Sequence, residues 1–350
     1  MSAPALDLER LRGLSADALD ATLRAFADAH GAGALPALSS LAASPGERAV
    51  RRAAKLALYR LSQRGVVPPP RPAPRPVVEY QPERATRAWI SGIDGSGSRA
   101  AWILFEGGVG GARLCSLIVN DTVGIVEVAG GGITKKRLEA ELAALRASQK
   151  LPWLETDPAR GTGLVAEALA LHRATGTSPP SAFGRWQRLF ETAAVPAPPP
   201  LPAADPALVE RSAELLELPE LAGWFFEPEA VQADALELLE ARASRLVVSD
   251  RIKAEREDAI VDRVVERELA PEARRRWTRR LAEMAFVFDA TARPDPAALA
   301  QAAAARLADD GADARRHPLA RGLAQRALEL AGEVASGRLS AADVSRKPGA

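Results

Sequence analysis

The sequence predicts a mostly helical α+β multidomain protein, with helices at both ends and a small antiparallel sheet in the middle. The spacing of apolar residues is helical in the first 66 residues and after residue 205, and strand-like in between. Two proline-rich stretches separate these regions. A chain of 350 residues is also longer than a single hydrophobic core usually serves.

These boundaries divide the chain into three folded parts and two linkers. The predicted parts are a helical module over 1–66, a linker rich in proline and arginine over 67–84, a small α+β domain over 85–194, a proline-rich linker over 195–204, a helical bundle over 205–340, and a flexible tail over 341–350.

The first module begins with a predicted helix that Ser15 caps, followed by Leu19, Leu23 and Phe26 at helical spacing. Two further helices are joined by a short turn: ALPALSSLAAS leads into PGERAVRRAAKLALYRL. Over about residues 33–64 this hairpin resembles a HEAT or HEAT-like repeat. The resemblance implies a helical surface that binds protein or nucleic acid.

The middle segment carries four strand-like runs, RAWISGI, RAAWILFE, LCSLIV and GIVEVAG. The first two flank the segment 94–98 (DGSGS), which is predicted to be a hairpin turn rather than a calcium loop, because the later acidic ligands are missing. Helical spacing resumes after Gly132. We therefore expect four antiparallel strands with one face covered by helices.

After the second linker the pattern is helical again, and five or six helices fit residues 205–340. Asp205-Pro206 and Asp295-Pro296 each combine a capping residue with a proline at a helix start, and Pro228 and Pro271 indicate further starts. Large aromatic residues are concentrated here, and we interpret them as core. They are Trp224, Phe225, Phe226, Trp277, Phe286 and Phe288.

The strongest functional signal is a segregation of charge. Arg48 to Arg87 contain ten basic residues and two acidic ones, a local net charge of +8 in a chain whose total is +1. Such side chains neutralise phosphates, and arginine also binds them in a bidentate manner. The predicted polyanion-binding residues are Arg48, Arg51, Arg52, Lys55, Arg71 and Arg75.

Two other interpretations of this segment remain open. The same concentration of basic residues is typical of a solvated helix face followed by a soluble, charged linker. In addition, Asp205 to Glu240 contain ten acidic residues against Arg211 alone, so the basic and acidic segments could contact each other within one chain or across a homodimer.

A second basic cluster, Arg274 to Arg280, places Trp277 among five arginines, as nucleic-acid surfaces often do. On a helix, however, Trp277 shares a stripe with Ala273, Leu281 and Met284, which predicts that it faces the core.

A weaker candidate is an anion site in a predicted turn between a strand and a helix. It comprises Gly131, Gly132, Thr134, Lys135 and Lys136. Glycines admit a ligand to the backbone, and helix N-termini attract anions. The segment matches neither the P-loop nor the dinucleotide fingerprint, and an ordinary turn with Thr134 as a helix cap is the competing interpretation.

Catalytic and metal-binding patterns are absent from the sequence. His30, His172 and His317 have no ligand spacing and are expected at the surface or at helix caps. Glu255, Asp258, Asp262 and Glu266 alternate with arginines and predict a salt-bridged helix face. The only cysteine, Cys115, lies within a strand and has no histidine nearby in sequence. We therefore predict no catalytic residue, no metal and no cofactor.

No apolar run is long enough to span a bilayer, and the N-terminus does not resemble a signal peptide, so we expect a cytoplasmic protein with no membrane partner.

The preferred hypothesis is a non-catalytic interaction or scaffold protein that docks on RNA, a ribonucleoprotein or DNA through the basic helix and arm. The alternative is a protein adaptor or homodimer held by the basic and acidic segments. An enzyme without a recognisable motif, using a cleft between the sheet segment and the C-terminal helices, is a third. The partner, the oligomeric state and any activity are not predicted.

Overall fold

The computed structural model describes residues 6, 11, 13–44, 48–66, 82–108, 110–148, 151–197, 200–243 and 250–346. The chain forms two compact units, Met1–Glu79 and Tyr80–Ala350. Within the described ranges, no helix combines the length and the apolar character that crossing a membrane requires.

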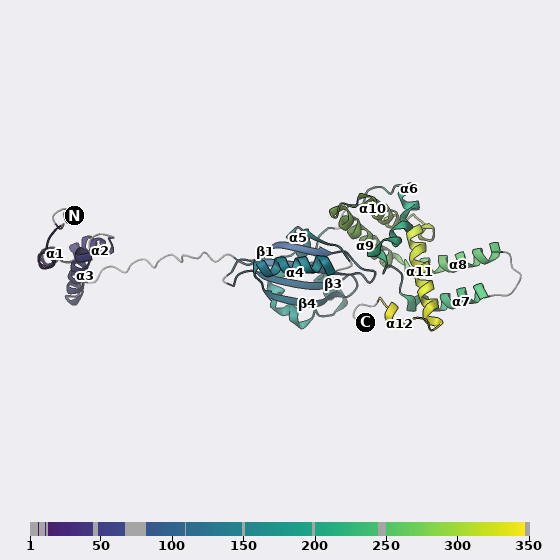
Figure 1. The fold of residues 1–350 in the computed structure, drawn as a ribbon, viewed down its shortest axis with the longest axis horizontal. Helices are drawn as coiled ribbons and strands as arrows, with labels where there is room; N and C mark the ends of the chain where they lie inside the picture. The colour runs from purple at the N-terminus through teal and green to yellow at the C-terminus, as the bar shows by residue number, and fades with distance from the viewer. Residues whose placement is uncertain are drawn as a thin grey trace. The chain divides into compact units, whose positions relative to one another are not determined.

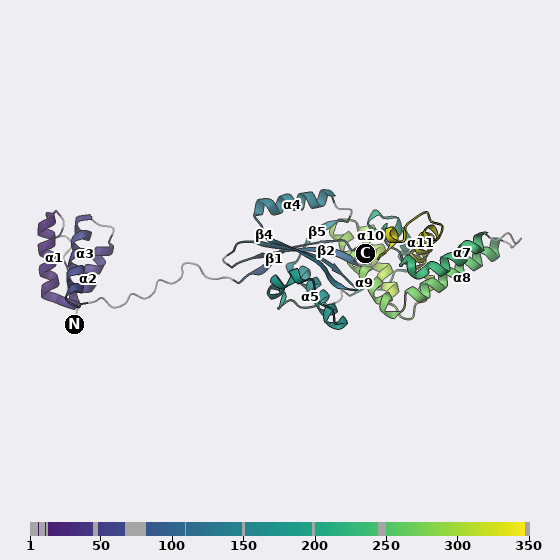
Figure 2. The same cartoon turned by 90° about the horizontal axis from the view of Figure 1, so that it is seen from below.

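The N-terminal unit is a bundle of three helices, which Figure 2 shows side by side. Its elements are α1 (Ala16–His30), the 3-10 turn η2 (Gly31–Ala34), α2 (Leu35–Ala43) and α3 (Arg48–Gln63). Ser15 caps α1 as predicted, accepting a hydrogen bond from the amide of Ala18 at 3.3 Å. Leucines and alanines from all three helices form one core. The resemblance to a HEAT repeat stays a prediction.

The second unit begins with a five-stranded antiparallel sheet in the order β4-β3-β2-β1-β5. The strands are β1 (Arg84–Ser91), β2 (Ser98–Glu106), β3 (Arg113–Asn120), β4 (Gly124–Gly132) and β5 (Trp153–Thr156). The four predicted strands are present, but the prediction missed β5. A run of four residues after a proline is too short to show the alternation that identifies a strand.

Helices cover both faces of the sheet, so the expectation of one covered face was wrong (Figure 2). On one side α4 (Lys135–Ser148) places Leu138 and Leu142 against Trp89 and Leu104. On the other side α5 (Pro158–Thr175) packs Val165 and Ala168 against strand side chains that point to the opposite face of the sheet, among them Ile103 and Phe105. Both phases of RAAWILFE are apolar, and such a strand must be buried on both faces.

The C-terminal part of this unit is helical, as predicted, and contains six α-helices among the described residues of 205–340 (Figure 1). They are α6 (Pro206–Glu210), α7 (Gln232–Ala243), α8 (Asp250–Glu268), α9 (Pro271–Ala290), α10 (Pro294–Ala308) and α11 (Pro318–Ala335). Short 3-10 turns lie between several of them, namely η5 (Ser212–Glu217), η6 (Pro219–Leu221), η7 (Pro228–Val231) and η8 (Ala314–Arg316). Two more, η3 (Ser181–Arg185) and η4 (Gln187–Phe190), precede α6.

The predicted helix starts were correct at three places and wrong at one. Asp205 caps α6 through the amide of Ala207, Pro271 begins α9, and Pro228 begins a 3-10 turn. Asp295 is not a cap, because α10 already begins at Pro294 and Asp295 lies in its first turn. Two prolines in PDP fit a helix start equally well, and the chain uses the first.

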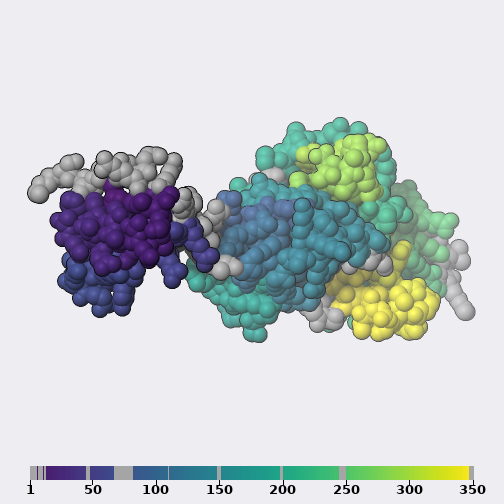
Figure 3. Space-filling model, turned by 60° about the vertical axis from the view of Figure 1, so that its left-hand side comes forward, coloured from purple at the N-terminus to yellow at the C-terminus, as the bar shows by residue number. Residues whose placement is uncertain are grey.

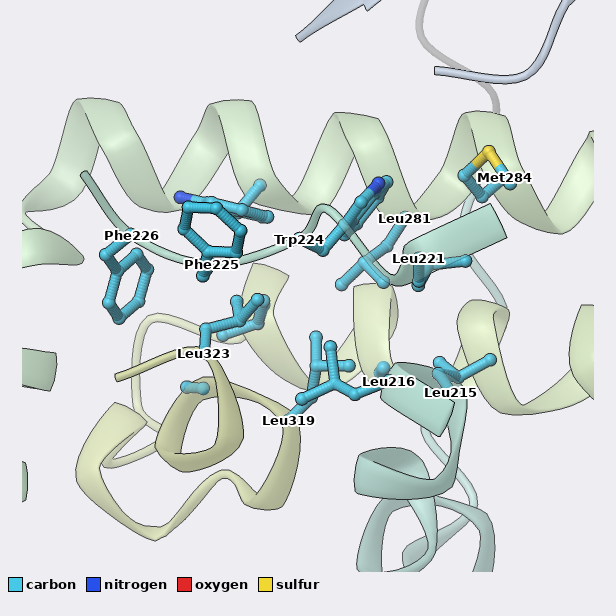
Figure 4. Close-up of a cluster of buried hydrophobic side chains, with 14 of the residues drawn as sticks. Leu215, Leu216, Leu221, Trp224, Phe225, Phe226, Leu281, Met284, Leu319 and Leu323 are labelled. Atoms are coloured by element: carbon cyan, nitrogen blue, oxygen red, sulfur yellow. The ribbon is translucent and has the colours of Figure 1, made fainter. Parts of the chain in front are cut away.

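One hydrophobic core joins the sheet to the C-terminal helices. Trp224, Phe225 and Phe226 run alongside α9, with Leu319 and Leu323 of α11 on their other side (Figure 4). Ile90, Ala101 and Leu164 of the sheet segment belong to the same cluster. The predicted role of the aromatic residues as core is confirmed, with Phe286 half-buried at its edge. In the space-filling view the two parts lie directly against each other (Figure 3).

The turn between β1 and β2 packs closely against the loop that follows η6. It is the predicted hairpin turn, in which the Asp94 carboxylate accepts from the amides of Ser96 and Ser98 at 2.9 Å. A Cβ atom on Gly95 would lie 1.7 Å from the backbone oxygen of Gly223. A side chain at position 95 would therefore clash with the backbone of Gly223, and only glycine leaves room for this approach.

The end of the chain differs from the predicted flexible tail over 341–350. Ala341–Val344 form a short helix, α12, and Val344 is buried. Arg346 lies over the ring of Phe225 and its amide donates to Glu227 at 2.9 Å. These contacts order residues 341–346, and the last four residues lie outside the described ranges. The predicted division between 85–194 and 205–340 stays a prediction.

Candidate functional site

The basic face of α3 comprises Arg48, Arg51, Arg52 and Lys55. These residues follow each other at positions i, i+3, i+4 and i+7, which places them on one side of a helix. The opposite side carries Ala53, Ala54, Ala57 and Leu61, all buried in the bundle. Arg48, Arg52 and Lys55 are exposed and Arg51 is half-buried. The sequence therefore placed these four cations on a common face correctly.

The charges of this face are not neutralised by the described part of the unit. None of the four side chains has an acidic partner among residues 13–44 and 48–66. Two arginines further along the chain do have acidic partners. Arg60 of α3 pairs with Asp20 at 2.8 Å, and Arg64, just after α3, pairs with Asp28. Tyr59, 61% exposed, lies one turn beyond Lys55 on the basic face. The predicted binding residues Arg71 and Arg75 lie outside the described residues.

The acidic segment 205–240 has many of its charges paired inside its own unit. Asp234 contacts both Arg263 and Arg267, at 2.7 and 2.8 Å. Glu220 pairs with Arg293, and Glu237 with Arg263. These pairs leave fewer carboxylates for the basic segment than the sequence suggests.

The structure does not form the predicted turn at the candidate anion site. Gly131 and Gly132 belong to β4, where they lie opposite Leu114 and Arg113 of β3. Pairing with β3 keeps both glycines in the strand, and only the preceding Gly130 approaches β3 so closely that a Cβ atom on it would lie 2.0 Å from the Leu114 oxygen. Thr134 caps α4 by accepting from the amide of Arg137 at 3.3 Å. Lys135 and Lys136 follow it, exposed, in the first turn of α4.

Most arginines of the cluster on α9 bind other groups within the protein. Trp277 is 7% exposed and packs edge-on against Trp224 and Phe226, so the prediction that it faces the core is confirmed. Arg274 donates to the backbone oxygens of Leu307 and Ala312. Arg280 binds Asp121 through two nitrogens, at 2.7 and 2.8 Å, and also donates to the Gly95 oxygen.

A buried ion cluster lies where β2, α5 and α9 meet. Arg99 of β2 and Glu283 of α9 have side chains 3% and 5% exposed, and they pair at 2.6 Å. Glu283 also contacts Arg160 of α5 at 2.7 Å and Arg279 of α9 at 3.2 Å. Arg279 in turn pairs with Glu167 of α5 at 3.0 Å. The five side chains connect three elements in a single network.

The surroundings of this network shift the pKa values of its members. Burial alone would raise the pKa of Glu283, but Arg99, Arg160 and Arg279 outweigh it and lower that pKa to about 2. Burial lowers the pKa of Arg99, opposed by Glu283. Burial raises the pKa of Glu167, because Arg279 compensates it only in part. Glu283 is thus held firmly as a carboxylate, while Glu167 is less acidic than an exposed glutamate.

A cavity of about 350 Å³ opens beside this network. It lies between the helices α5 and α9 and the end of the sheet where β2 begins and β3 finishes. Its apolar wall includes Val119 and Leu171, and its charged wall includes Arg279 and Glu283. The volume is at the lower end of the range, roughly 300–1000 Å³, of small-molecule sites. This is a cleft with convergent polar side chains, which the enzyme hypothesis required.

The remaining predicted site candidates have structural roles. His317 caps α11 as predicted and is buried, and burial lowers its pKa to about 4. His172 is buried as well, so its expected place at the surface or at a cap was wrong. It accepts from the amide of Ile125 at 3.0 Å and thereby ties α5 to β4. Burial raises the pKa of the Cys115 thiol to about 12, which removes it as a nucleophile.

The acidic face of α8 is salt-bridged, but not by the arginines that alternate with its acids: Arg321 contacts Asp258 and Asp262, and Arg251 contacts Glu255. Arg263 and Arg267 of α8 pair with Asp234 of α7 instead. Among the described residues, no group of three or more histidine, cysteine, aspartate or glutamate side chains is arranged to hold a metal ion.

The ion cluster has no direct signature in the sequence, because its members come from three elements and lie up to 184 residues apart. One signal was present. Side chains two positions apart in a strand point to the same face of the sheet, so Arg99 shares a face with Ala101, Ile103 and Phe105. The sequence thus shows a charge on a face that is otherwise apolar. A buried arginine requires a partner, but the pattern does not say which one.

Comparison with known proteins covers only part of this arrangement. No curated protein and no solved structure matches the chain. Residues 187–332, from η4 to α11, match the family model of the Y4lR C-terminal helical domain. That range contains Glu283 and Arg279, whereas Arg99, Arg160 and Glu167 precede it. The cavity is therefore formed by α9, which lies within the matched residues, and by the sheet and α5, which lie outside them.

Proposed function

We propose that this protein is a cytoplasmic interaction protein that docks on a polyanionic partner, RNA, a ribonucleoprotein or DNA, through the basic face of α3. The observation that carries the proposal is the lack of acidic partners for Arg48, Arg51, Arg52 and Lys55 among the described residues, although other arginines of the unit are paired. Four cations on one helix face, unpaired within the described residues, attract phosphates and release the counterions of the nucleic acid. The resemblance to a HEAT-like hairpin supports a helical binding surface.

Tyr59 strengthens the case for nucleic acid within this proposal. Its exposed ring lies on the basic face, and bases of single strands stack on exposed aromatic rings between cations. The rival hypothesis, an adaptor held by the basic and acidic segments, receives less support, because Asp234, Glu220 and Glu237 are already paired with arginines of their own unit.

Charge reversal of the basic face is expected to weaken binding of the full chain to a labelled single-stranded RNA by at least about tenfold at low salt. The variant replaces Arg48, Arg51, Arg52 and Lys55 by Glu, and fluorescence anisotropy measures the dissociation constant. Circular dichroism checks that the helices are retained, which is expected because the four side chains make no ion pair in the described unit.

A matched control reverses four other basic residues and so changes the net charge equally. Arg173, Arg188, Lys253 and Arg256 have no acidic partner among the described residues of the second unit. This control is expected to bind RNA nearly as tightly as wild type. If both variants bind equally, or if the wild-type chain binds neither RNA nor DNA at low salt, the proposal is wrong.

A further inference from the structure

The cavity beside the ion cluster is distinct from the basic face of α3 and independent of the function proposed for it. Its apolar lining consists of Ile93, Val119, Leu164, Ala168 and Leu171. These residues come from the β1–β2 turn, β3 and α5, which are packed into the core. A pocket lined mainly by apolar side chains favours the apolar body of a small ligand.

The charges of the inner wall are already matched. Glu283 lies between three guanidinium groups, and Glu167 is paired with Arg279. Asp121, also in the lining, is bound by Arg280 through two nitrogens. These groups stabilise the cavity and offer no uncompensated charge to a ligand.

The mouth of the cavity differs, because it carries arginines that are weakly held. Among the described residues Arg275 is exposed and has no acidic partner. Arg276 pairs at 3.2 Å only with Glu272, whose side chain is 81% exposed. Such an exposed pair contributes about 0–1 kcal/mol and gives way readily to another anion. Two guanidinium groups thus stand at the end of an apolar cavity.

We propose that this cavity binds a small amphipathic carboxylate, with its apolar chain against Val119, Leu164 and Leu171 and its carboxylate on Arg275 and Arg276. A carboxylate fits the planar guanidinium in a bidentate manner. A single negative charge fits better than a phosphate dianion, because Glu272 and Glu167 also line the cavity. The ligand is a monocarboxylic acid with a chain short enough for about 350 Å³.

Octanoate is a suitable probe, and isothermal titration calorimetry with the full chain measures its binding. The wild type is expected to bind octanoate, whereas octylammonium, with the same chain and the opposite charge, is expected to bind at least about tenfold more weakly. Inorganic phosphate and acetate, which lack the apolar chain, are expected not to bind detectably.

Two variants test the two halves of the cavity separately. Arg275→Glu with Arg276→Glu is expected to weaken octanoate binding by at least about tenfold, because both anion contacts become repulsive. Leu171→Trp is expected to weaken it similarly by filling the space. Arg173→Glu with Arg188→Glu removes as much positive charge elsewhere on the same unit and is expected to leave binding unchanged. Urea unfolding verifies that each variant is folded.

The proposal is overturned by no octanoate binding by the wild type at millimolar concentration, by equal binding of octanoate and octylammonium, or by octanoate binding that the Arg275/Arg276 variant retains. Phosphate binding tighter than that of octanoate would likewise refute it, since it would assign the cavity mouth to a plain anion site. RNA binding through α3 is measured separately, so either proposal can fail without the other.

Discussion

Replacing Glu283 by Gln is expected to lower the free energy of unfolding by about 3–5 kcal/mol, measured by urea denaturation near neutral pH. The substitution removes the negative charge that Arg99 contacts at 2.6 Å, while the Arg99 side chain stays 3% exposed. A buried guanidinium without a counter-charge is far less favourable than the same group in water. Arg160 and Arg279 then repel Arg99 as well.

The pH dependence of this effect provides a second signature. The pKa of Glu283 is lowered to about 2 from an ordinary value of 4.5. Its stabilising contribution is therefore complete above the ordinary value and is lost as the pH falls from there towards 2, where the unfolded chain takes up the proton more readily. The difference between wild type and Glu283→Gln should accordingly be constant near neutral pH and shrink in acid.

Glu272→Gln is the matched control on the same helix. Glu272 forms an exposed pair with Arg276, so its replacement should cost about 0–1 kcal/mol. Replacing both Arg99 and Glu283 by Met should destabilise less than Glu283→Gln, because the fully buried Arg99 guanidinium is removed together with its counter-charge and only the partly exposed Arg160 loses its acidic partner. A Glu283→Gln variant as stable as the Glu272→Gln control would contradict the role assigned to the cluster.

Trp224→Ala is expected to destabilise the second unit by about 3–5 kcal/mol in the same denaturation experiment. The Trp224 side chain is fully buried, its ring contacts Trp277 at 5.5 Å between centroids, and its indole nitrogen donates to the Ile93 oxygen at 3.3 Å. It thus joins the C-terminal helices to the β1–β2 turn. Truncation leaves a cavity where the two parts of the core meet.

Trp224→Phe separates packing from hydrogen bonding. It keeps an aromatic ring in the core and removes the donor to Ile93, so it should cost about 1–3 kcal/mol and less than Trp224→Ala. If Trp224→Ala unfolded at the same urea concentration as wild type, the sheet and the C-terminal helices would not share a core as described.

Much of the fold could be predicted from local signals. Ser15, Asp205 and Pro271 mark helix starts through their own backbone preferences, and the short apolar, β-prone run RAAWILFE marks a strand without knowledge of its neighbours. The basic face of α3 was predictable for the same reason, since it depends only on helical spacing. The missed strand β5 lacks such a signal: four residues become a strand because β1 offers a free edge.

The ion cluster and the cavity could not be predicted, because they depend on how distant elements pack. Nothing near Glu283 in sequence distinguishes it from Glu272, eleven positions earlier on α9. One is buried beside Arg99 and the other is exposed, and only the position of α9 against β2 and α5 decides this. Similarly, the glycines Gly131 and Gly132 indicated a turn locally, whereas pairing with β3 makes them a strand.

The salt dependence of RNA binding tests the proposed docking surface most directly. For single strands, the slope of log K against log salt decreases by about 0.7 for each lost phosphate contact. Arg52→Ala should make the slope shallower by about that amount. Arg60→Ala should leave it unchanged, because the Arg60 guanidinium is bound to Asp20 and lies off the basic face. Equal slopes for wild type, Arg52→Ala and Arg60→Ala would contradict a phosphate-binding role for the basic face of α3.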